Sequence, residues 1–114
     1  MKRTLRLGNK ICTFYKDLTQ DESENVLAQV KKWSKNADFC AKTGKNLQTD
    51  NCGTTILTSK RAVVILSNQT SKAEMLNTFA HEVRHVVDAI IAETPGISPA
   101  QLTGDIFSHF ADWL

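Results

Sequence analysis

The stretch Ala62-Val63-Val64-Ile65-Leu66 is the part of the sequence that most constrains the fold. An unbroken apolar run of this length, rich in β-branched residues, is typical of a β-strand that is covered on both faces. Ser59-Lys60 separates it from the strand-like residues 53–58, so residues 53–58 and 61–67 together predict a hairpin. We therefore expect residues 61–67 to form a central strand of a sheet.

The residues before this hairpin predict another hairpin and a helix. Residues 4–7 and 10–15 flank Gly8-Asn9, and both of these residue types tolerate the positive φ of a two-residue turn. From Thr19 the pattern becomes helical, because Thr19 and Glu22 have capping-box spacing and apolar residues then recur on one face. Residues 36–52 show no sustained period and predict a long loop.

Two helices are expected after the central strand. The pattern of residues 72–92 is helical and ends at Thr94-Pro95-Gly96. Ser98 and Pro99 then have the residue types favoured at an N-cap and at the first helical position, so a last helix is expected to run to the C-terminus. The short connection predicts that these two helices lie antiparallel.

The order of these elements predicts the fold class. Two strands, a helix, two strands and two helices indicate an α+β fold, with a small, mostly antiparallel sheet and three helices packed on it. A chain of 114 residues has the size of one domain, here residues 1–114. Its hydrophobic content of 41% and charged content of 23% exclude the disordered and coiled-coil classes.

Composition also bears on location and partners. No apolar run approaches the ~18 residues that cross a bilayer, and the N-terminus lacks the apolar stretch of a secretory signal. We therefore expect a cytoplasmic protein with no membrane partner. The net charge is +2, with basic residues concentrated before residue 62, but no binding motif or aromatic interleaving accompanies them, so we do not expect nucleic acid as a partner. The sequence leaves the oligomeric state open.

The three cysteines, Cys12, Cys40 and Cys52, lack the spacing of a disulfide framework or of a self-contained zinc knuckle. Reduced thiols are the simplest interpretation. The alternative is that Cys40 and Cys52, at the predicted loop, add soft ligands to a metal ion.

The predicted helix 72–92 contains His81-Glu82-Val83-Arg84-His85, which is the H-E-x-x-H pattern. Residues four apart share a helix face, so both imidazoles can reach one metal ion, while Glu82 is turned about 100° toward the place of a metal-bound water. Zn²⁺ lowers the pKa of such a water toward 7, and a carboxylate can take its proton and deliver it to a leaving amine. The pattern therefore predicts His81 and His85 as zinc ligands and Glu82 as the general base.

Chance and ordinary packing explain this pattern poorly. The composition gives only about 0.003 expected occurrences of the pattern in a chain of this length. On a helical wheel the two histidines lie opposite the centre of a broad apolar arc, on a face that is polar and has small side chains. The arc consists of Leu76, Phe79, Val83, Val86, Val87 and Ile90.

A zinc site needs at least one more ligand. On an antiparallel last helix, the rise of 1.5 Å per residue brings residues 105–110 back to the level of the two histidines. Asp105 is therefore our provisional third ligand, and His109, four residues later, is an alternative. Glu93 is another alternative, although it lies about 12 Å along the same helix from His85. Solvent or a partner protein would otherwise complete the site.

The segment Phe79-Ala80-His81-Glu82-Val83-Arg84-His85-Val86-Val87-Asp88 resembles the zincin metallopeptidases, in particular the small gluzincin-like ones. With Ala100-Gln101-Leu102-Thr103-Gly104 it is also similar to short uncharacterised proteins of phages and conjugative elements, in which H-E-x-x-H-x-V-D precedes a helix with A-Y-L-T-G. The resemblance implies a zincin-like fold, a Zn²⁺ ion on the two histidines and hydrolysis of peptide bonds. Those proteins tend to carry a Glu before the Ala, where this chain has Ile97-Ser98-Pro99.

Two classes of function follow as expectations. The first is a small zinc-dependent metallopeptidase with a peptide or protein substrate. The second is a non-catalytic interaction module of a phage or conjugative element on a zincin-like scaffold.

Two residues close to the histidines have two possible roles each. Asp88 would either orient an imidazole or be solvated, and Arg84 would either bind a substrate carboxylate or be solvated.

Overall fold

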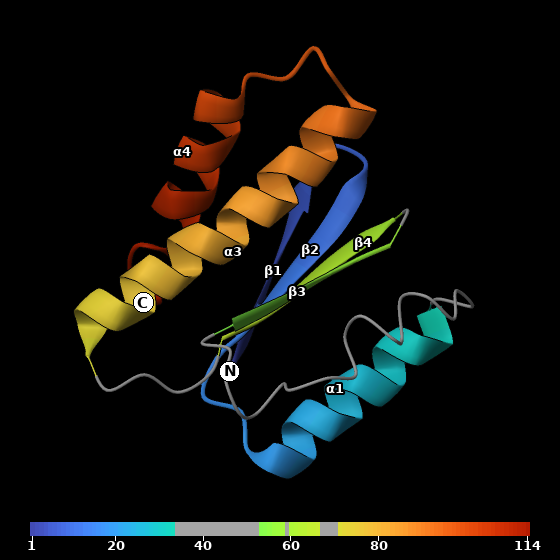
Figure 1. Ribbon diagram of the computed structural model, residues 1–114, viewed down its shortest axis with the longest axis vertical. Coiled ribbons are helices and arrows are strands. Elements are labelled where there is room, and N and C mark those ends of the chain that lie inside the picture. Colours follow the sequence, from blue (N-terminus) through green and yellow to red (C-terminus); the bar gives the residue numbers. More distant parts are fainter. Residues whose placement is uncertain (34–52, 59, 67–70) are drawn as a thin grey trace.

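The computed structural model describes residues 1–33, 53–58, 60–66 and 71–114 (Figure 1). The elements, in chain order, are β1 (Lys2–Leu7), β2 (Lys10–Tyr15), α1 (Gln20–Trp33), β3 (Gly53–Leu57), β4 (Arg61–Leu66), α3 (Lys72–Glu93) and α4 (Pro99–Phe110). The α+β class is thus confirmed. The predicted loop 36–52, with Cys40 and Cys52, lies outside the described residues.

The four strands form one sheet in the order β1-β2-β4-β3, which corrects the prediction of a mostly antiparallel sheet. Both hairpins are antiparallel, but β2 and β4 pair in parallel, with Cys12 opposite Ala62 and Phe14 opposite Val64. The sheet is therefore mixed. The two inner strands are the second strand of each hairpin, because these carry the residues that are buried on both faces.

The strand β4 is central and covered on both faces, as its sequence predicts. Ala62, Val64 and Leu66 belong to the core beneath α3 and α4, whereas Val63 and Ile65 belong to the core beneath α1. Figure 1 shows the resulting layers, with α3 and α4 on one side of the sheet and α1 on the other.

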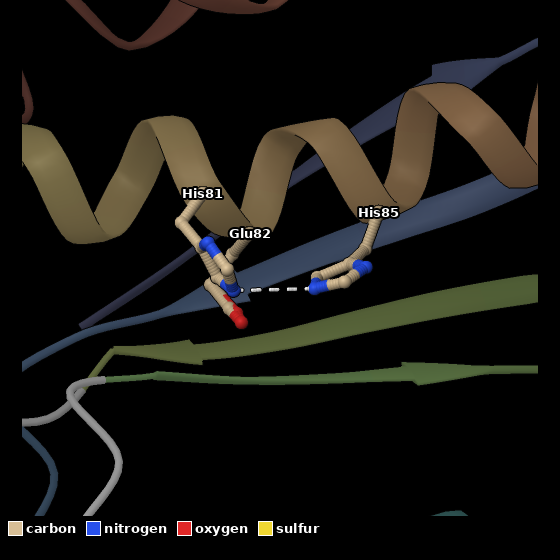
Figure 2. A group of neighbouring side chains, drawn as sticks. All are labelled: His81, Glu82 and His85. Atoms are coloured by element: carbon tan, nitrogen blue, oxygen red, sulfur yellow. Dashed lines mark hydrogen bonds between the residues drawn. The ribbon is translucent and has the colours of Figure 1, made fainter.

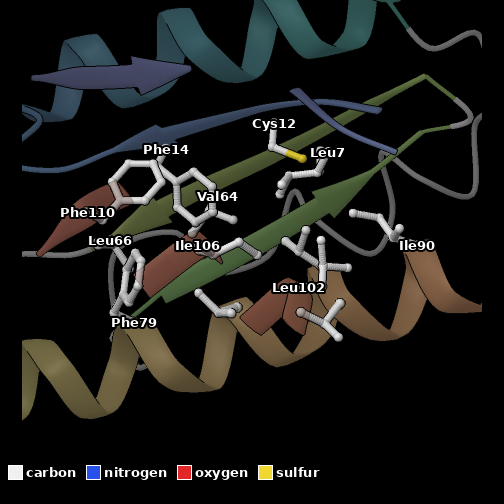
Figure 3. Packing of buried hydrophobic residues seen from close by; sticks show 14 of the residues in the cluster. Leu7, Cys12, Phe14, Val64, Leu66, Phe79, Ile90, Leu102, Ile106 and Phe110 are labelled. Atoms are coloured by element: carbon white, nitrogen blue, oxygen red, sulfur yellow. The ribbon is translucent and has the colours of Figure 1, made fainter. Parts of the chain in front are cut away.

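The larger core lies between the sheet and the two C-terminal helices, and aromatic side chains fill it at one end (Figure 3). The ring of Phe14, on β2, has its centroid 4.5 Å from that of Phe110 and 5.6 Å from that of Phe79. All three rings are fully buried. They join β2, α3 and α4, so the motif helix α3 is held firmly against the sheet.

The helix caps predicted at Thr19 and at Ser98 are present, and Ser71 caps α3 as well. Thr19 and Glu22 form a reciprocal capping box at α1, and the hydroxyls of Ser71 and Ser98 accept hydrogen bonds from the backbone of α3 and α4. α4 ends at Phe110 instead of running to the C-terminus, and turns then bring the ring of Trp113 within 5.2 Å of the Phe110 ring. None of the helices described is long and apolar enough to cross a membrane.

A buried lysine joins the far end of α3 to the sheet. Lys10, at 1% exposure, donates from Nζ to the carbonyl of Thr58 (2.6 Å) and to Oε1 of Glu93 (3.1 Å). Asn9 donates to the other oxygen of the Glu93 carboxylate at 2.7 Å. The turn between β1 and β2 is close to α3, since a Cβ at Gly8, which has φ +56°, would lie 3.2 Å from Ile90.

Candidate metal centre

Three side chains of α3, those of His81, Glu82 and His85, point toward the hairpin of β3 and β4 (Figure 2). The Nε2 atoms of the two histidines lie 3.3 Å apart, and their rings are nearly perpendicular. A ligand atom from each of the three residues lies within 4.8 Å of the other two, so the structure brings together the three residues of the predicted motif.

The separation of the two imidazole nitrogens fits a single zinc ion. With Zn–N bonds of about 2.0–2.1 Å and a tetrahedral angle, two nitrogen ligands of one ion lie about 3.3 Å apart. Both side chains are exposed, so an ion can reach them from solvent. The two rings therefore need little movement to hold a metal.

Glu82 is in a different environment from the histidines, because its side chain lies between α3 and β3 and is only 4% exposed. Thr55, on β3, donates its hydroxyl to Oε2 of Glu82 at 3.3 Å. Gly53, on the same face of β3, leaves space for the side chain, since a Cβ at this position would lie 2.9 Å from Cγ of Glu82. The strand therefore shapes the surroundings of the carboxylate.

Burial is the main influence on the carboxyl group, and it raises the pKa of Glu82 above the ordinary value. The two histidines and the hydrogen bond from Thr55 act in the opposite direction on this pKa, because they stabilise the charged form. A raised pKa moves a carboxyl group toward the range in which it can both accept and return a proton near neutral pH.

The three motif residues line a cleft of about 300 Å³ between α3 and the edge strand β3. The remaining lining comes from Gly53, Thr54, Thr55 and Leu57. The face of α3 that carries the candidate metal ligands therefore opens into a cavity large enough for a small ligand or part of a larger one.

The structure does not bring Asp105 to the histidines. The group of potential ligand atoms found among the described residues contains His81, Glu82 and His85 but not Asp105. Thr103, Gly104 and Phe107 line the groove beside α3, and Asp105 lies roughly 150° around α4 from this side. Its carboxylate accepts a hydrogen bond from the side chain of Gln101, one turn earlier on the same helix.

The two alternative third ligands also lie elsewhere. Glu93 is at the far end of α3, where Asn9 and Lys10 bind its carboxylate and lower its pKa. The backbone of His109, near the end of α4, accepts a hydrogen bond from Arg3 on β1. Within the described part of the chain, the metal group thus has two imidazoles and one carboxylate.

Arg84 and Asp88 pair with each other rather than with the histidines. Nε of Arg84 donates to both oxygens of Asp88, at 2.9 and 3.1 Å, and both side chains are well exposed. The pair borders a second hollow, a groove of about 710 Å³ between α3 and α4 with a mostly apolar lining that includes Val87, Ile91 and Phe107.

Sequence reasoning missed the contribution of β3 to the site. The alternation of Gly53, Thr55 and Leu57 identifies one face of the strand, but nothing in the sequence shows that this face meets Glu82. The packing of α3 on β3 brings the residues together from separate parts of the chain.

Comparison with known protein families, with curated proteins and with solved structures gives no match to this chain.

Proposed function

We propose that the protein is a zinc-dependent peptidase, in which His81 and His85 hold the ion and Glu82 acts as general base. The observation that carries this proposal is the 3.3 Å separation of the two Nε2 atoms beside a buried carboxylate. Two nitrogen ligands of one tetrahedral ion lie about this far apart, and the same distance is also that of a hydrogen bond between the two imidazoles.

When bound, Zn²⁺ supplies a lowered pKa for a coordinated water and polarises a carbonyl group. The other roles in the reaction belong to residues of the chain. His81 and His85 would hold the ion, and Glu82 would accept a proton and pass it to the leaving nitrogen. The raised pKa of Glu82 supports this double role, because a more basic carboxylate takes up the proton more readily.

The position of β3 favours an extended peptide as substrate. Among the described strands, β3 pairs only with β4, so no strand in the described part of the chain pairs with the backbone N–H and C=O groups of its outer edge. An extended peptide can pair with such an edge. The same strand lines the cleft that contains the motif, so a peptide on this edge would lie beside the metal ligands.

The non-catalytic interaction module remains the second candidate, because the described residues supply only two imidazoles to the site. Catalytic zinc sites generally have three protein ligands and one open position. A metal held by fewer protein ligands would bind more weakly and would serve association instead of hydrolysis.

A single substitution separates the two candidates. Glu82→Gln keeps the shape of the side chain and both imidazoles but removes the base. We expect zinc-loaded wild-type protein to cleave members of a peptide library and the variant, at equal zinc content, to lose at least about a hundredfold in rate. Equal rates for the two proteins, or no cleavage by either, would exclude the peptidase.

A further inference from the structure

The strand β3 contacts Glu82 through two residues on one of its faces. Gly53 and Thr55 are two residues apart, so they lie on the same side of the strand, toward α3. The Thr55 hydroxyl is 3.3 Å from Oε2 of Glu82 and 3.4 Å from the Glu82 backbone carbonyl. The single proton of this hydroxyl is therefore shared between the carboxylate and the backbone carbonyl of the motif residue.

Gly53 makes room for the same side chain. A Cβ at this position would lie 2.9 Å from Cγ of Glu82, 3.2 Å from its Cδ and 3.0 Å from the Cγ2 methyl of Thr78. The side chains that it would meet are buried, with Glu82 at 4% and Thr78 at 7% exposure. Any larger residue at position 53 would displace the Glu82 side chain.

We propose that Gly53 and Thr55 are positioning residues for Glu82. Gly53 leaves the space that the Glu82 side chain occupies, and the Thr55 hydroxyl holds one carboxylate oxygen, so that the carboxylate stays within 4.8 Å of the histidine nitrogens. Neither residue supplies a metal ligand or a proton. The catalytic consequence rests on the proposed function, but the positioning of the carboxylate does not.

The kinetic test uses Thr55→Val, which removes the hydroxyl and keeps the side-chain shape. We expect kcat to fall about tenfold, with KM and zinc affinity unchanged, because the hydrogen bond orients the base and not the substrate or the ion. Thr55→Ser restores the hydroxyl and should recover most of kcat. A merely structural threonine would lower stability but not kcat per folded molecule, and that result would overturn the proposal.

The control for this substitution is Thr4→Val. Thr4 lies on β1, at the opposite edge of the sheet, and its hydroxyl is 3.4 Å from that of Thr13. The same chemical change at this position should leave kcat at the wild-type value. An equal loss of kcat in both variants would show that the effect is general and would contradict a role specific to Thr55.

A second test needs no catalysis and uses metal-free protein. In a double-mutant cycle, Thr55→Val should raise the unfolding equilibrium constant about fivefold in the wild-type background and by a smaller factor in the Glu82→Ala background, where only the contact with the backbone carbonyl of residue 82 remains. Equal factors in the two backgrounds would overturn the proposal. The cycle measures stability alone, so it tests the contact between Thr55 and Glu82 even if the wild-type protein hydrolyses no peptide. In that case the proposed function fails, but the positioning proposal is still tested.

Gly53→Ala tests the other half of the proposal and does not depend on Thr55. The added methyl should displace the Glu82 carboxylate and lower kcat by at least tenfold with zinc affinity retained, because His81 and His85 are untouched. The position of Glu82 in a crystal structure of the variant is a direct readout. An unmoved Glu82 side chain would contradict the role of Gly53.

Discussion

The Nε2 atom of His81 lies 3.3 Å from the Nε2 atom of His85, one helical turn away on the exposed face of α3. The two rings are nearly perpendicular, with an interplanar angle of 83°, and their Nε2 atoms are within hydrogen-bond distance of each other (Figure 2). This arrangement gives α3 a face on which a metal ion could be held, while the opposite face of the helix is in the core. The effects of this site on stability and on zinc binding can be measured without measuring hydrolysis.

Zinc should stabilise the folded protein through the two histidines. An ion that binds only the folded state adds RT ln(1 + [Zn]/Kd), about 4 kcal/mol at a thousandfold excess over Kd. For a domain of this size the melting temperature should rise by roughly 10 to 20 °C, and chelation should reverse the rise. His81→Ala should abolish the effect in differential scanning calorimetry.

Asp105→Ala is the matched control for the zinc effect. Because Asp105 faces away from α3 and accepts a hydrogen bond within α4, its removal should leave the zinc-dependent rise in melting temperature intact. Loss of the rise in Asp105→Ala would mean that α4 contributes a ligand, contrary to the arrangement described above.

The local features of the fold could be predicted from the sequence. The hairpins, the capping box at Thr19 and the N-cap Ser98 depend on residues close together in the chain, so short patterns identify them. The parallel pairing of β2 with β4 could not be predicted, because it depends on how two separate hairpins pack against each other. The apolar sequence of β4 predicts that both of its faces are buried, but it does not predict which strand pairs with it.

The same limit applies to the site. The spacing of His81 and His85 is a property of one helix, and the structure places the two side chains together as expected. The prediction of Asp105 as third ligand depended on which side of α4 is turned toward α3, and the sequence does not fix this rotation. The side of α4 that lines the groove beside α3 carries the small residues Ala100, Thr103 and Gly104. The roles of Gly53 and Thr55 depend on contact between β3 and α3.

Substitutions in α3 should reveal where the core lies. Phe79→Ala removes a fully buried ring in contact with Phe14, so the free energy of unfolding should fall by about 3–5 kcal/mol. Leu76, which the helical pattern assigns to the core, is 39% exposed, so Leu76→Ala should cost less than about 1 kcal/mol. Urea denaturation measures both values, and similar losses would contradict this packing.

The buried lysine should be important for stability. Lys10→Ala removes the donor that binds the Thr58 carbonyl and the Glu93 carboxylate, so the free energy of unfolding should fall by about 2–4 kcal/mol. Lys10→Met keeps much of the buried aliphatic volume and should recover part of the loss. If Lys10→Ala unfolds at the wild-type urea concentration, the lysine does not hold α3 to the sheet.

Glu93 should make stability depend on pH. Hydrogen bonds from Asn9 and Lys10 lower the pKa of Glu93 in the folded state, so the unfolded state binds its proton at higher pH. Its contribution to stability is therefore present above the ordinary pKa of a glutamate and is lost as the pH falls through the lowered value. Glu93→Gln should be less stable than wild type at pH 7, and the difference should shrink in acid. A difference that is constant with pH in thermal melts would contradict this linkage.

The most direct measurement of the central claim is the X-ray absorption spectrum of zinc bound to the wild-type protein at one equivalent. We predict two imidazole nitrogens at about 2.0–2.1 Å from the ion, and the loss of one imidazole in His85→Ala. A spectrum without imidazole ligands, or protein that binds no zinc at micromolar concentration near neutral pH, would contradict the assignment of His81 and His85 as the metal site.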